Sequence, residues 1–492
     1  MSSPSKMNHF INNEDHAPES NQWIPSYNPF TGEVWNEVPR GNENDAKSAI
    51  SAAYNAFQEG SWRQMTPSGR GALLRKLGDL IARDAEKLAR IEVLDNGKLF
   101  AEMHGQLKYI PQWFYYYAGL ADKVEGSVIS TDKPETFAYT SHEPLGVVVG
   151  ITPWNSPLLI TAWKLAPALA AGNTVILKPS EHTTASSLEF VKLVKEAGFP
   201  PGVVNVVSGF GHEVGEALIR DPRVAKVSFT GGEEGGRKVY SAAADGIKRV
   251  TLELGGKSPN IVFEDAEIEN AVKGVVSGIF AASGQTCIAG SRLLVQSSIH
   301  DQFVEQLLEL ARTAKMGNPL DSDTQVGPVA TVPQYEKILS YIEVAKKEGA
   351  SCVLGGKKAR CGSGWFVEPT IFTGVKNNMR IAQEEVFGPV LSIIPFETPE
   401  EAISIANDIP YGLAAGVWTR DMRKASKCAK ELQVGTVWVN TYRSISYMSP
   451  FGGYKRSGIG REGGKEAIYD YLQTKSVMIN HSTEVANPFV MR

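Results

Sequence analysis

An apolar run, GVVVGIT at residues 146–152, begins the part of the sequence that decides the fold. A regular alternation of Val/Ile-rich runs and helix-like segments then continues to residue 252. We expect strands at residues 146–152, 174–177, 203–207, 224–229 and 249–252, and helices at residues 158–171, 184–197, 213–220 and 233–244. Continuous apolar strands that alternate with crossover helices are typical of a parallel sheet covered on both faces. Such a sheet binds ligands outside the carboxyl ends of its strands.

The rest of the chain predicts a second α/β unit and a small β element. Residues 259–456 form the second unit, with strands expected at residues 293–295, 390–394, 416–419 and 436–439. The small element consists of a hairpin at residues 128–131 and 136–140 and a strand at residues 471–479, all of which alternate in polarity. Ahead of the first sheet, apolar periodicity predicts helices at residues 44–59, 67–95 and 102–121.

Length and composition narrow the class of protein. The 492 residues exceed what one hydrophobic core usually serves, so two or more domains are expected. The formal net charge of -4 argues against a nucleic-acid surface. Four cysteines are too few for a disulfide scaffold, and without paired histidines nearby Cys352 and Cys361 are not expected to hold zinc or another metal. No run has the length of a membrane helix and the first residues lack a signal pattern, so a cytoplasmic protein without membrane contact is expected.

Polar and glycine-rich groups follow the expected strands of the first sheet, on its ligand-binding side. They are Thr152-Pro153-Trp154-Asn155, Lys178-Pro179-Ser180-Glu181, Phe229-Thr230-Gly231-Gly232 and Glu253-Leu254-Gly255-Gly256. The third precedes a helix whose N-terminus can receive a phosphate, although it is not a G-x-G-x-x-G fingerprint. Glu181 either accepts hydrogen bonds from ribose hydroxyls or is an ordinary acid at the start of a helix.

A single cysteine, Cys287, lies where a helix-like run at residues 271–282 gives way to a loop of small residues. A thiol in that place can attack a substrate if a base or a positive environment gives it thiolate character. The alternative is a buried cysteine that acts as a small hydrophobe. Glu253 is either a general base for such chemistry or a solvated loop acid.

Seven motifs together resemble the aldehyde dehydrogenase superfamily. Two resemble its active-site signatures, namely Phe280-x3-Gly284-Gln285-x-Cys287 and Leu252-Glu253-Leu254-Gly255-Gly256-Lys257. The other five follow in the family's order: Pro153-Trp154-Asn155, Lys178-Pro179-Ser180-Glu181, Phe229-Thr230-Gly231, Glu384-Glu385-Val386-Phe387-Gly388-Pro389 and Pro450-Phe451-Gly452-Gly453-Tyr454-Lys455. The resemblance covers nearly the whole chain, from about residue 27 to residue 475.

The resemblance implies a covalent oxidation of an aldehyde to the acid. Cys287 resembles the nucleophile, and the Asn155 amide with the Cys287 N–H resembles the donor pair for the oxyanion. Hydride transfer to NAD would leave a thioester, which water activated by Glu253 would hydrolyse. The presence of Glu253 disfavours the acylating subgroup, which uses coenzyme A. NADP is the less expected cofactor, because a carboxylate at Glu181 would repel a 2′-phosphate.

The resemblance also implies the residues that bind the cofactor and the substrate. The cofactor residues are Thr152, Trp154, Lys178, Glu181, Thr230, Gly231, Gly232, Glu385 and Phe387. Many family members carry serine where this chain has Gly232, so a hydroxyl contact to the pyrophosphate is lost. Ile160, Trp163 and Phe451 are expected to line the aldehyde tunnel. Arg443 at its mouth either binds a carboxylate or another oxygen-rich end of a semialdehyde, or is exposed or paired with an acid.

The family's architecture implies an α/β protein with three parts. A Rossmann-type parallel-sheet NAD-binding domain is expected at residues 1–125 and 145–256, and a second α/β catalytic domain at residues 257–456. A small β oligomerisation element is expected at residues 126–144 and 457–492, which predicts a homodimer or homotetramer. Two rival functions stay open: a cysteine-dependent esterase without redox chemistry, and a non-enzymatic protein that kept the fold.

Overall fold

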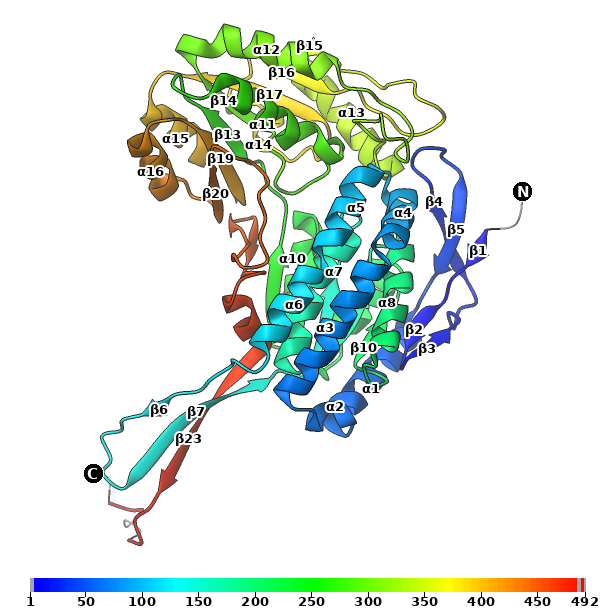
Figure 1. Ribbon diagram of the computed structural model, residues 1–492, viewed down its shortest axis with the longest axis vertical. Helices are drawn as coiled ribbons and strands as arrows, with labels where there is room; N and C mark the ends of the chain where they lie inside the picture. Colours follow the sequence, from blue (N-terminus) through cyan, green and yellow to red (C-terminus); the bar gives the residue numbers. More distant parts are fainter. Residues whose placement is uncertain (1–3, 485–487, 491–492) are drawn as a thin grey trace.

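The structure is a computed structural model that describes residues 4–484 and 488–490. Figure 1 shows a body that contains the first sheet, a lobe above it that contains a second sheet, and an arm of β-strands that projects from the body. Residues 1–3, 485–487 and 491–492 of the expected domains lie outside the described residues.

The first sheet contains all five strands expected between residues 146 and 252. Its strands are, in spatial order, β22 (Gly458–Ile459), β12 (Arg249–Glu253), β11 (Val224–Thr230), β8 (Val147–Ile151), β9 (Thr174–Lys178), β10 (Val204–Val206), β2 (His9–Ile11) and β3 (Glu14–His16). The five central strands are parallel, and the edge strands β22, β2 and β3 are antiparallel to their neighbours. The parallel core brings the carboxyl ends of β8, β9, β11 and β12 to one edge.

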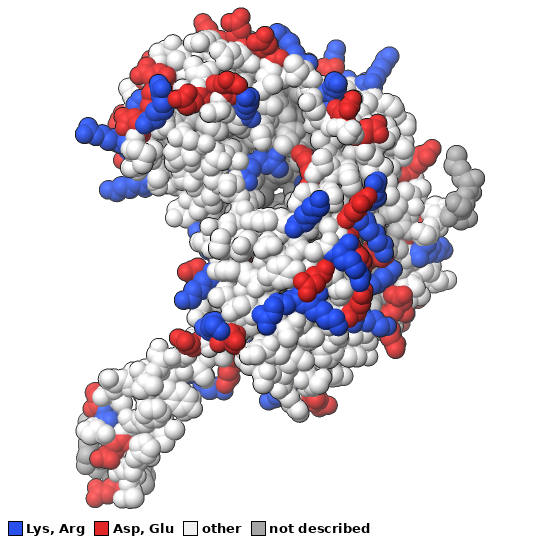
Figure 2. Space-filling view, viewed as in Figure 1, with Lys and Arg blue, Asp and Glu red and all other residues white. Residues whose placement is uncertain are grey.

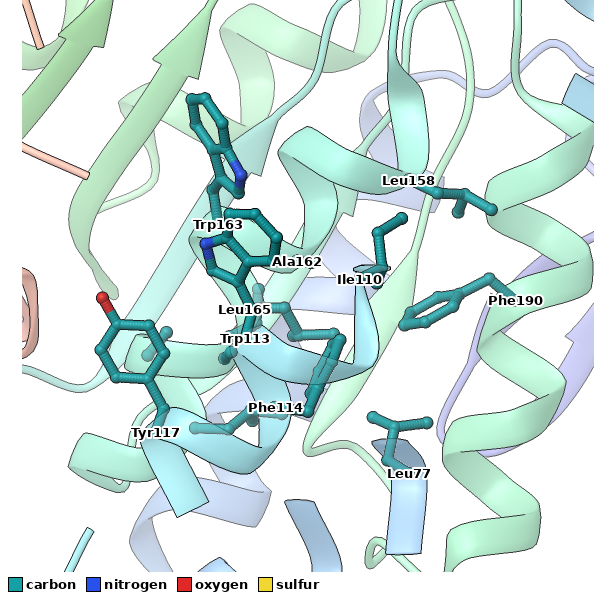
Figure 3. Packing of buried hydrophobic residues seen from close by; sticks show 14 of the residues in the cluster. Leu77, Ile110, Trp113, Phe114, Tyr117, Leu158, Ala162, Trp163, Leu165 and Phe190 are labelled. Atoms are coloured by element: carbon teal, nitrogen blue, oxygen red, sulfur yellow. The ribbon is translucent and has the colours of Figure 1, made fainter. Parts of the chain in front are cut away.

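Helices from two parts of the chain surround this sheet. Those of the alternating region are α7 (Pro157–Ala171), α8 (Ala185–Ala197), α9 (Glu216–Arg220), which continues a π-helical turn at Gly211–Gly215, and α10 (Glu233–Ala244). Those that precede the sheet are α1 (Glu43–Gln58), α2 (Ser61–Gln64), α3 (Pro67–Arg83), α4 (Ala85–Asn96), α5 (Phe100–Tyr109) and α6 (Pro111–Leu120). Every residue of α7 is buried, because α3, α6 and the sheet enclose it. Figure 3 shows Trp113 and Phe114 of α6 packed against this helix.

Two of the expected long helices are broken. The helix expected at residues 67–95 is interrupted at Asp84, where α3 ends and α4 begins. The helix expected at residues 102–121 is α5 followed by α6, with the break at Ile110 before Pro111. A proline lacks the N–H that an α-helix interior needs, but it is tolerated in a first turn, and it therefore starts a new helix here.

The second sheet forms the lobe. Its strands are, in spatial order, β15 (Ser351–Leu354), β16 (Thr370–Thr373), β17 (Val390–Phe396), β14 (Arg292–Gln296), β13 (Pro259–Val262), β19 (Ala414–Trp418) and β20 (Thr436–Val439). All neighbours are parallel except β15 and β16. The helices of the lobe are α11 (Ile268–Phe280), α12 (His300–Arg312), α13 (Val332–Lys347), α14 (Arg380–Gln383), α15 (Pro399–Asn407) and α16 (Met422–Glu431).

The expected hairpin and C-terminal strand form the arm. β6 (Val128–Ile129) pairs with β7 (Thr136–Pro144), and β7 pairs antiparallel with β23 (Leu472–Asn480). The arm exposes large apolar side chains, including Val128, Phe137, Met478 and Ile479. Two further small sheets complete the structure: β1 (Ser5–Lys6) with β4 (Trp23–Tyr27) and β5 (Val34–Pro39), and β18 (Tyr411–Gly412) with β21 (Tyr454–Lys455).

Three sequence-based expectations concern the surface charge, membrane-spanning helices and metal-ligating side chains. Figure 2 shows positive and negative side chains interspersed over the visible face, without an extended patch of one sign. Across residues 4–484 and 488–490, no helix is both long enough and apolar enough to cross a membrane. No group of metal-ligating side chains occurs in the same residues.

Candidate active site

Cys287 lies in a strained loop between the lobe and the body. After α11 the chain makes a short turn at Ala281–Gly284 in which Ala282, Ser283 and Gly284 all have positive φ angles, of 52°, 52° and 70°. Positive φ is unfavourable for residues with a side chain and concentrates at functional sites. A Cβ atom at Gly284 would lie 2.0 Å from the Gly388 carbonyl oxygen, so only glycine fits there. The G-Q-x-C motif is therefore tied to the E-E-V-F-G-P motif by close backbone contact.

Gln285 anchors the cysteine loop and connects it to Asn155. Its amide oxygen accepts a hydrogen bond from the Ala330 N–H at 2.9 Å, and its backbone oxygen accepts one from the Asn155 amide at 2.9 Å. The Asn155 amide has two N–H bonds, so one is left for a ligand. In the described part of the chain, the Cys287 N–H also has no hydrogen-bond partner. Two free donors thus lie near the thiol.

Glu253 ends β12 and is buried, with 3% of its surface exposed. The alternative of a solvated loop acid is therefore wrong. Among the described residues, its Oε1 atom has no hydrogen-bond partner. The two glycines that follow allow Glu385 to approach: the Gly256 N–H donates to Glu385 at 2.9 Å, and a Cβ atom at Gly255 would lie 2.2 Å from the same carboxylate.

Burial controls the protonation of both reactive groups. Burial is the largest cause that raises the pKa of the Cys287 thiol to about 12; the Glu253 and Glu385 carboxyls act in the same direction, and Lys98 acts in the opposite direction. Burial and the neighbouring Glu462 carboxylate raise the pKa of Glu253 well above its usual range, and Lys164 and Arg461 oppose them. The resting site therefore favours a neutral thiol, and Glu253 becomes a base as the pH rises through its raised pKa.

A buried ion pair lies next to Glu253. The Lys164 ammonium on α7 contacts Glu462 at 2.6 Å and also donates to the Ser228 and Thr230 hydroxyls of β11, at 3.1 Å and 2.8 Å. Glu462 accepts a further hydrogen bond from Ser228 at 3.0 Å. The second Glu462 oxygen has no partner within the residues that the structure describes. The hydroxyl of Thr230, an expected cofactor residue, is thus already engaged by Lys164.

One cavity of about 510 Å³ contains the thiol, the amide and the carboxyl together. Of the expected residues, it is lined by Trp154, Asn155, Ile160, Trp163, Thr230, Gly231, Gly232, Glu253, Cys287, Glu385, Phe387, Arg443 and Phe451. Figure 2 shows a hollow on the visible face where the lobe meets the body. The Phe387 ring meets the Trp154 ring edge-on at a centroid distance of 5.2 Å. All four expected substrate residues lie in this cavity.

A second cavity of about 760 Å³ adjoins the first, because both include Pro153, Trp154, Thr230 and Gly231. It contains the expected residues Thr152, Lys178 and Glu181. The Lys178 ammonium lies 3.9 Å from the Glu181 carboxylate, and burial lowers the pKa of Lys178. Helix α8 begins at Ala185 with Thr184 as its N-cap, so Glu181 is not part of that helix.

The two cavities fit a dinucleotide. Helix α10 begins where they meet, and Gly232 at its N-cap makes no side-chain hydrogen bond. Among the described residues, the first N–H groups of the helix therefore have no cap and are available to a phosphate. A Cβ atom at Gly232 would meet no atom within 4 Å, which is open space for a ligand. The buried Thr152 hydroxyl has no partner in the described structure. These residues suit a pyrophosphate and its flanking riboses.

Several cavity residues were not expected from the sequence. Lys98, Glu102, Gln106 and Tyr109 line the first cavity beside α5, as do Gln334 and Lys337 of α13. Gln334 donates to the backbone oxygens of Val386 and Phe387, at 2.8 Å and 2.9 Å, and so holds the Phe387 loop. The only sequence signal was the Asp95-Asn96-Gly97-Lys98 helix break, which indicates a turn and no more.

The sequence pattern of the aldehyde dehydrogenase family matches residues 16–477. The chain belongs to this family. The expected α/β fold class and the expected class of enzyme are thereby confirmed. The match covers the cysteine loop, the Glu253 segment and the glycine turn of α10, which the structure brings to one place.

Individual family members are similar over nearly their full length. A (Z)-2-((N-methylformamido)methylene)-5-hydroxybutyrolactone dehydrogenase from Acinetobacter baylyi is 47% identical, with 95% of this chain and 96% of that protein covered. The mitochondrial aldehyde dehydrogenase of Homo sapiens is 48% identical, with coverage of 96% and 91%. The crystal structure of betaine aldehyde dehydrogenase from Staphylococcus aureus, solved with NAD+, has a TM-score of 0.97 at 43% identity and covers 99% of this chain and 97% of its own.

Proposed function

We propose that this aldehyde dehydrogenase oxidises an aldehyde to the carboxylic acid, with NAD as the hydride acceptor and Cys287 as the nucleophile. The observation that carries the proposal is the single cavity in which Cys287, Asn155 and Glu253 meet, next to the free N-terminus of α10. Structural relatives that are solved with NAD+ support the choice of cofactor. The test is NADH absorbance with an aldehyde and NAD, beside ester turnover without NAD.

The first step is attack of the Cys287 sulfur on the aldehyde carbon, which forms a C–S bond and moves the carbonyl electrons to oxygen. The Cys287 N–H and the free Asn155 N–H are the donors for that oxyanion. Because burial keeps the thiol protonated, its proton must pass to a base as the bond forms. When bound, NAD supplies the ring that accepts a hydride from the same carbon. The product on the enzyme is a Cys287 thioester.

Glu253 is the base for hydrolysis of that thioester. Its unpartnered Oε1 atom is available to a water molecule, and it removes a proton as the water attacks the thioester carbon. The attack breaks the C–S bond and returns the proton to sulfur, which releases the acid.

The two rivals make different predictions in the same assay. A cysteine-dependent esterase would turn over an ester without NAD and would produce no NADH from an aldehyde. A non-enzymatic protein would do neither. The second cavity, which adjoins the first, favours a dehydrogenase over both rivals, because neither an esterase nor a structural protein needs a cofactor site.

We also propose that Arg443 binds a carboxylate or another oxygen-rich end of the substrate. Its guanidinium lines the cavity and donates one hydrogen bond, to the Ser277 backbone oxygen at 3.2 Å. It has no ion-pair partner among the residues that the structure describes. A planar fork of donors suits a carboxylate.

The expected result of Arg443→Ala is a rise in KM of about tenfold or more for an aldehyde that carries a carboxylate, with little change for an uncharged aldehyde of equal length. The reason is the loss of a charge-assisted hydrogen bond that only the first substrate makes. The measurement is steady-state kinetics on the two substrates. Equal changes in both KM values, or no change in either, would show that Arg443 does not read the substrate.

Preference for NAD over NADP should be at least about tenfold in kcat/KM, because the Glu181 carboxylate accepts from a ribose 2′-hydroxyl and repels a 2′-phosphate. Lys178, 3.9 Å from Glu181, moderates the repulsion. In Glu181→Gln the repulsion is lost and the ratio should fall. Parallel kinetics with the two cofactors measure both ratios, and an NADP preference in the wild type would contradict the role of Glu181.

We propose that the two sheets and the arm correspond to an NAD-binding domain, a catalytic domain and an oligomerisation element, with boundaries near residues 125, 145, 256 and 457. The apolar side chains that the arm exposes support a homodimer or homotetramer, because exposed apolar strands at a sheet edge favour pairing with another copy. The cytoplasmic location stays a prediction.

A further inference from the structure

The lining of the substrate cavity includes buried polar atoms that nothing in the described structure satisfies. Glu102 and Gln106 are four residues apart on α5, so they share one face of the helix, and both line the cavity. The Glu102 Oε1 atom accepts from the Ala282 N–H at 2.8 Å, but its Oε2 atom has no partner among the described residues. The Gln106 Oε1 atom has none either. These two buried oxygens can therefore each accept a hydrogen bond from a bound substrate.

Lys98 lines the same cavity and supplies donors. It is 4% exposed, and its ammonium donates to the Ser156 hydroxyl at 2.9 Å. An ammonium has three N–H bonds, so two are left over. Burial lowers the pKa of Lys98 to about 8, against an opposing effect of Glu102. Lys98 lines the same cavity as Glu102 and Gln106.

Aromatic side chains also line the cavity. Trp163 packs against Phe451 at a centroid distance of 5.0 Å and against Trp113 at 6.2 Å, and Tyr109 meets Trp113 edge-on at 5.1 Å. Figure 3 shows the Trp113 and Trp163 rings lying next to each other. A substrate in this cavity therefore meets both aromatic rings and unsatisfied hydrogen-bonding groups.

The balance of donors and acceptors restricts the substrate. A plain alkanal would leave the Glu102 and Gln106 oxygens buried and unpaired, which is costly. A carboxylate at this place would satisfy Lys98, but it only accepts hydrogen bonds and would be repelled by Glu102. A hydroxyl or an amide N–H both donates and accepts, so it suits Glu102, Gln106 and Lys98 together.

We propose that Glu102 and Gln106 select an aldehyde that carries a neutral hydroxyl or amide group along its length, with Lys98 as the partner donor. The proposal rests on the proposed aldehyde oxidation and adds the chemical class of the substrate. This proposal does not depend on the role of Arg443. Arg443 is proposed to bind a charged group at the end of the substrate, whereas Glu102 and Gln106 are proposed to bind a hydrogen-bond donor along its length.

The test replaces Gln106 with methionine, which keeps the side-chain length and removes the acceptor. Wild type and Gln106→Met are assayed with NAD on a straight-chain alkanal and on hydroxyalkanals of the same length, with the hydroxyl moved along the chain. We expect the wild type to prefer at least one hydroxyalkanal, and Gln106→Met to lower that preference in kcat/KM by at least about tenfold. Gln112→Met on α6, outside the cavity, is the matched control and should keep the wild-type ratio.

The melting temperature provides a second readout. Because Gln106→Met removes a buried oxygen that lacks a partner, we expect the melting temperature to stay the same or to rise. A lower melting temperature, or an unchanged substrate ratio, would overturn the proposal. If the wild type produces NADH from the alkanal but prefers no hydroxyalkanal, the substrate class fails while the proposed function stands. If it oxidises no aldehyde at all, both fail.

Discussion

Replacement of Cys287 by alanine should lower kcat/KM for NAD-dependent aldehyde oxidation by at least about 10⁴-fold, because the covalent bond to the substrate carbon can no longer form. NAD binding should persist. Lys178 and Glu181 lie in the second cavity, whereas Cys287 lies in the first. The measurement is NADH absorbance for turnover and quenching of tryptophan fluorescence for NAD binding.

Cys361→Ala is the matched control for this change. Cys361 is a partly exposed free thiol that lines neither cavity. The Cys361→Ala variant should therefore retain wild-type turnover. Full turnover by a pure Cys287→Ala protein would contradict the assignment of Cys287 as the nucleophile. Loss of NAD binding would show that the substitution had disturbed the structure of the loop.

Glu253→Gln should lower steady-state turnover by about 10²- to 10⁴-fold, the usual contribution of a general base. A burst of NADH in the first turnover should remain, because the thioester still forms and only its hydrolysis is slow. Stopped-flow absorbance separates the burst from the steady state. Glu269→Gln, an exposed acid on α11, is the control. A proportional loss of burst and steady state would mean that Glu253 acts on the thiol instead.

The pH profile gives the same prediction a second test. Burial and Glu462 raise the pKa of Glu253 well above its usual range, so the carboxyl is protonated at low pH and becomes a base as the pH rises. Steady-state turnover of the wild type should therefore rise with pH through that pKa, and Glu253→Gln should lack this rise. The Cys287 thiol also ionises at high pH. That ionisation affects the rate of the NADH burst, in which the thioester forms, and not the steady-state rate, which hydrolysis of the thioester limits.

The strand positions in the alternating region could be predicted from sequence because the strands are short and rich in apolar, mainly β-branched residues. Val147–Ile151 and Thr174–Lys178 are buried along their whole length, as parallel strands covered on both faces must be. The breaks at Asp84 and Ile110 could not be predicted from apolar periodicity, because the periodic pattern continues across both. The proline at residue 111 was a signal for the second break, since a proline marks a helix start.

The polar residues of the substrate cavity could be predicted from the sequence only in part. The sequence places Glu102 and Gln106 four residues apart, which is enough to put them on one helix face. It does not show which face meets the cavity, because that depends on how α5 packs against α7 and the cysteine loop. Ser156 and Lys98 are 58 residues apart in sequence, and only folding brings their side chains to 2.9 Å.

The sequence by itself determined the family and the parallel sheet, and it indicated Cys287, Asn155 and Glu253 as candidate catalytic residues, because these inferences depend on local patterns and motifs. Only the tertiary structure decided their chemical state. The high pKa of Glu253 arises from burial and from Glu462, a residue far along the chain, and the free oxygens of Glu102 and Gln106 exist because packing removed them from water without supplying a partner. Desolvation is a property of the packed interior, and short-range sequence patterns do not encode it.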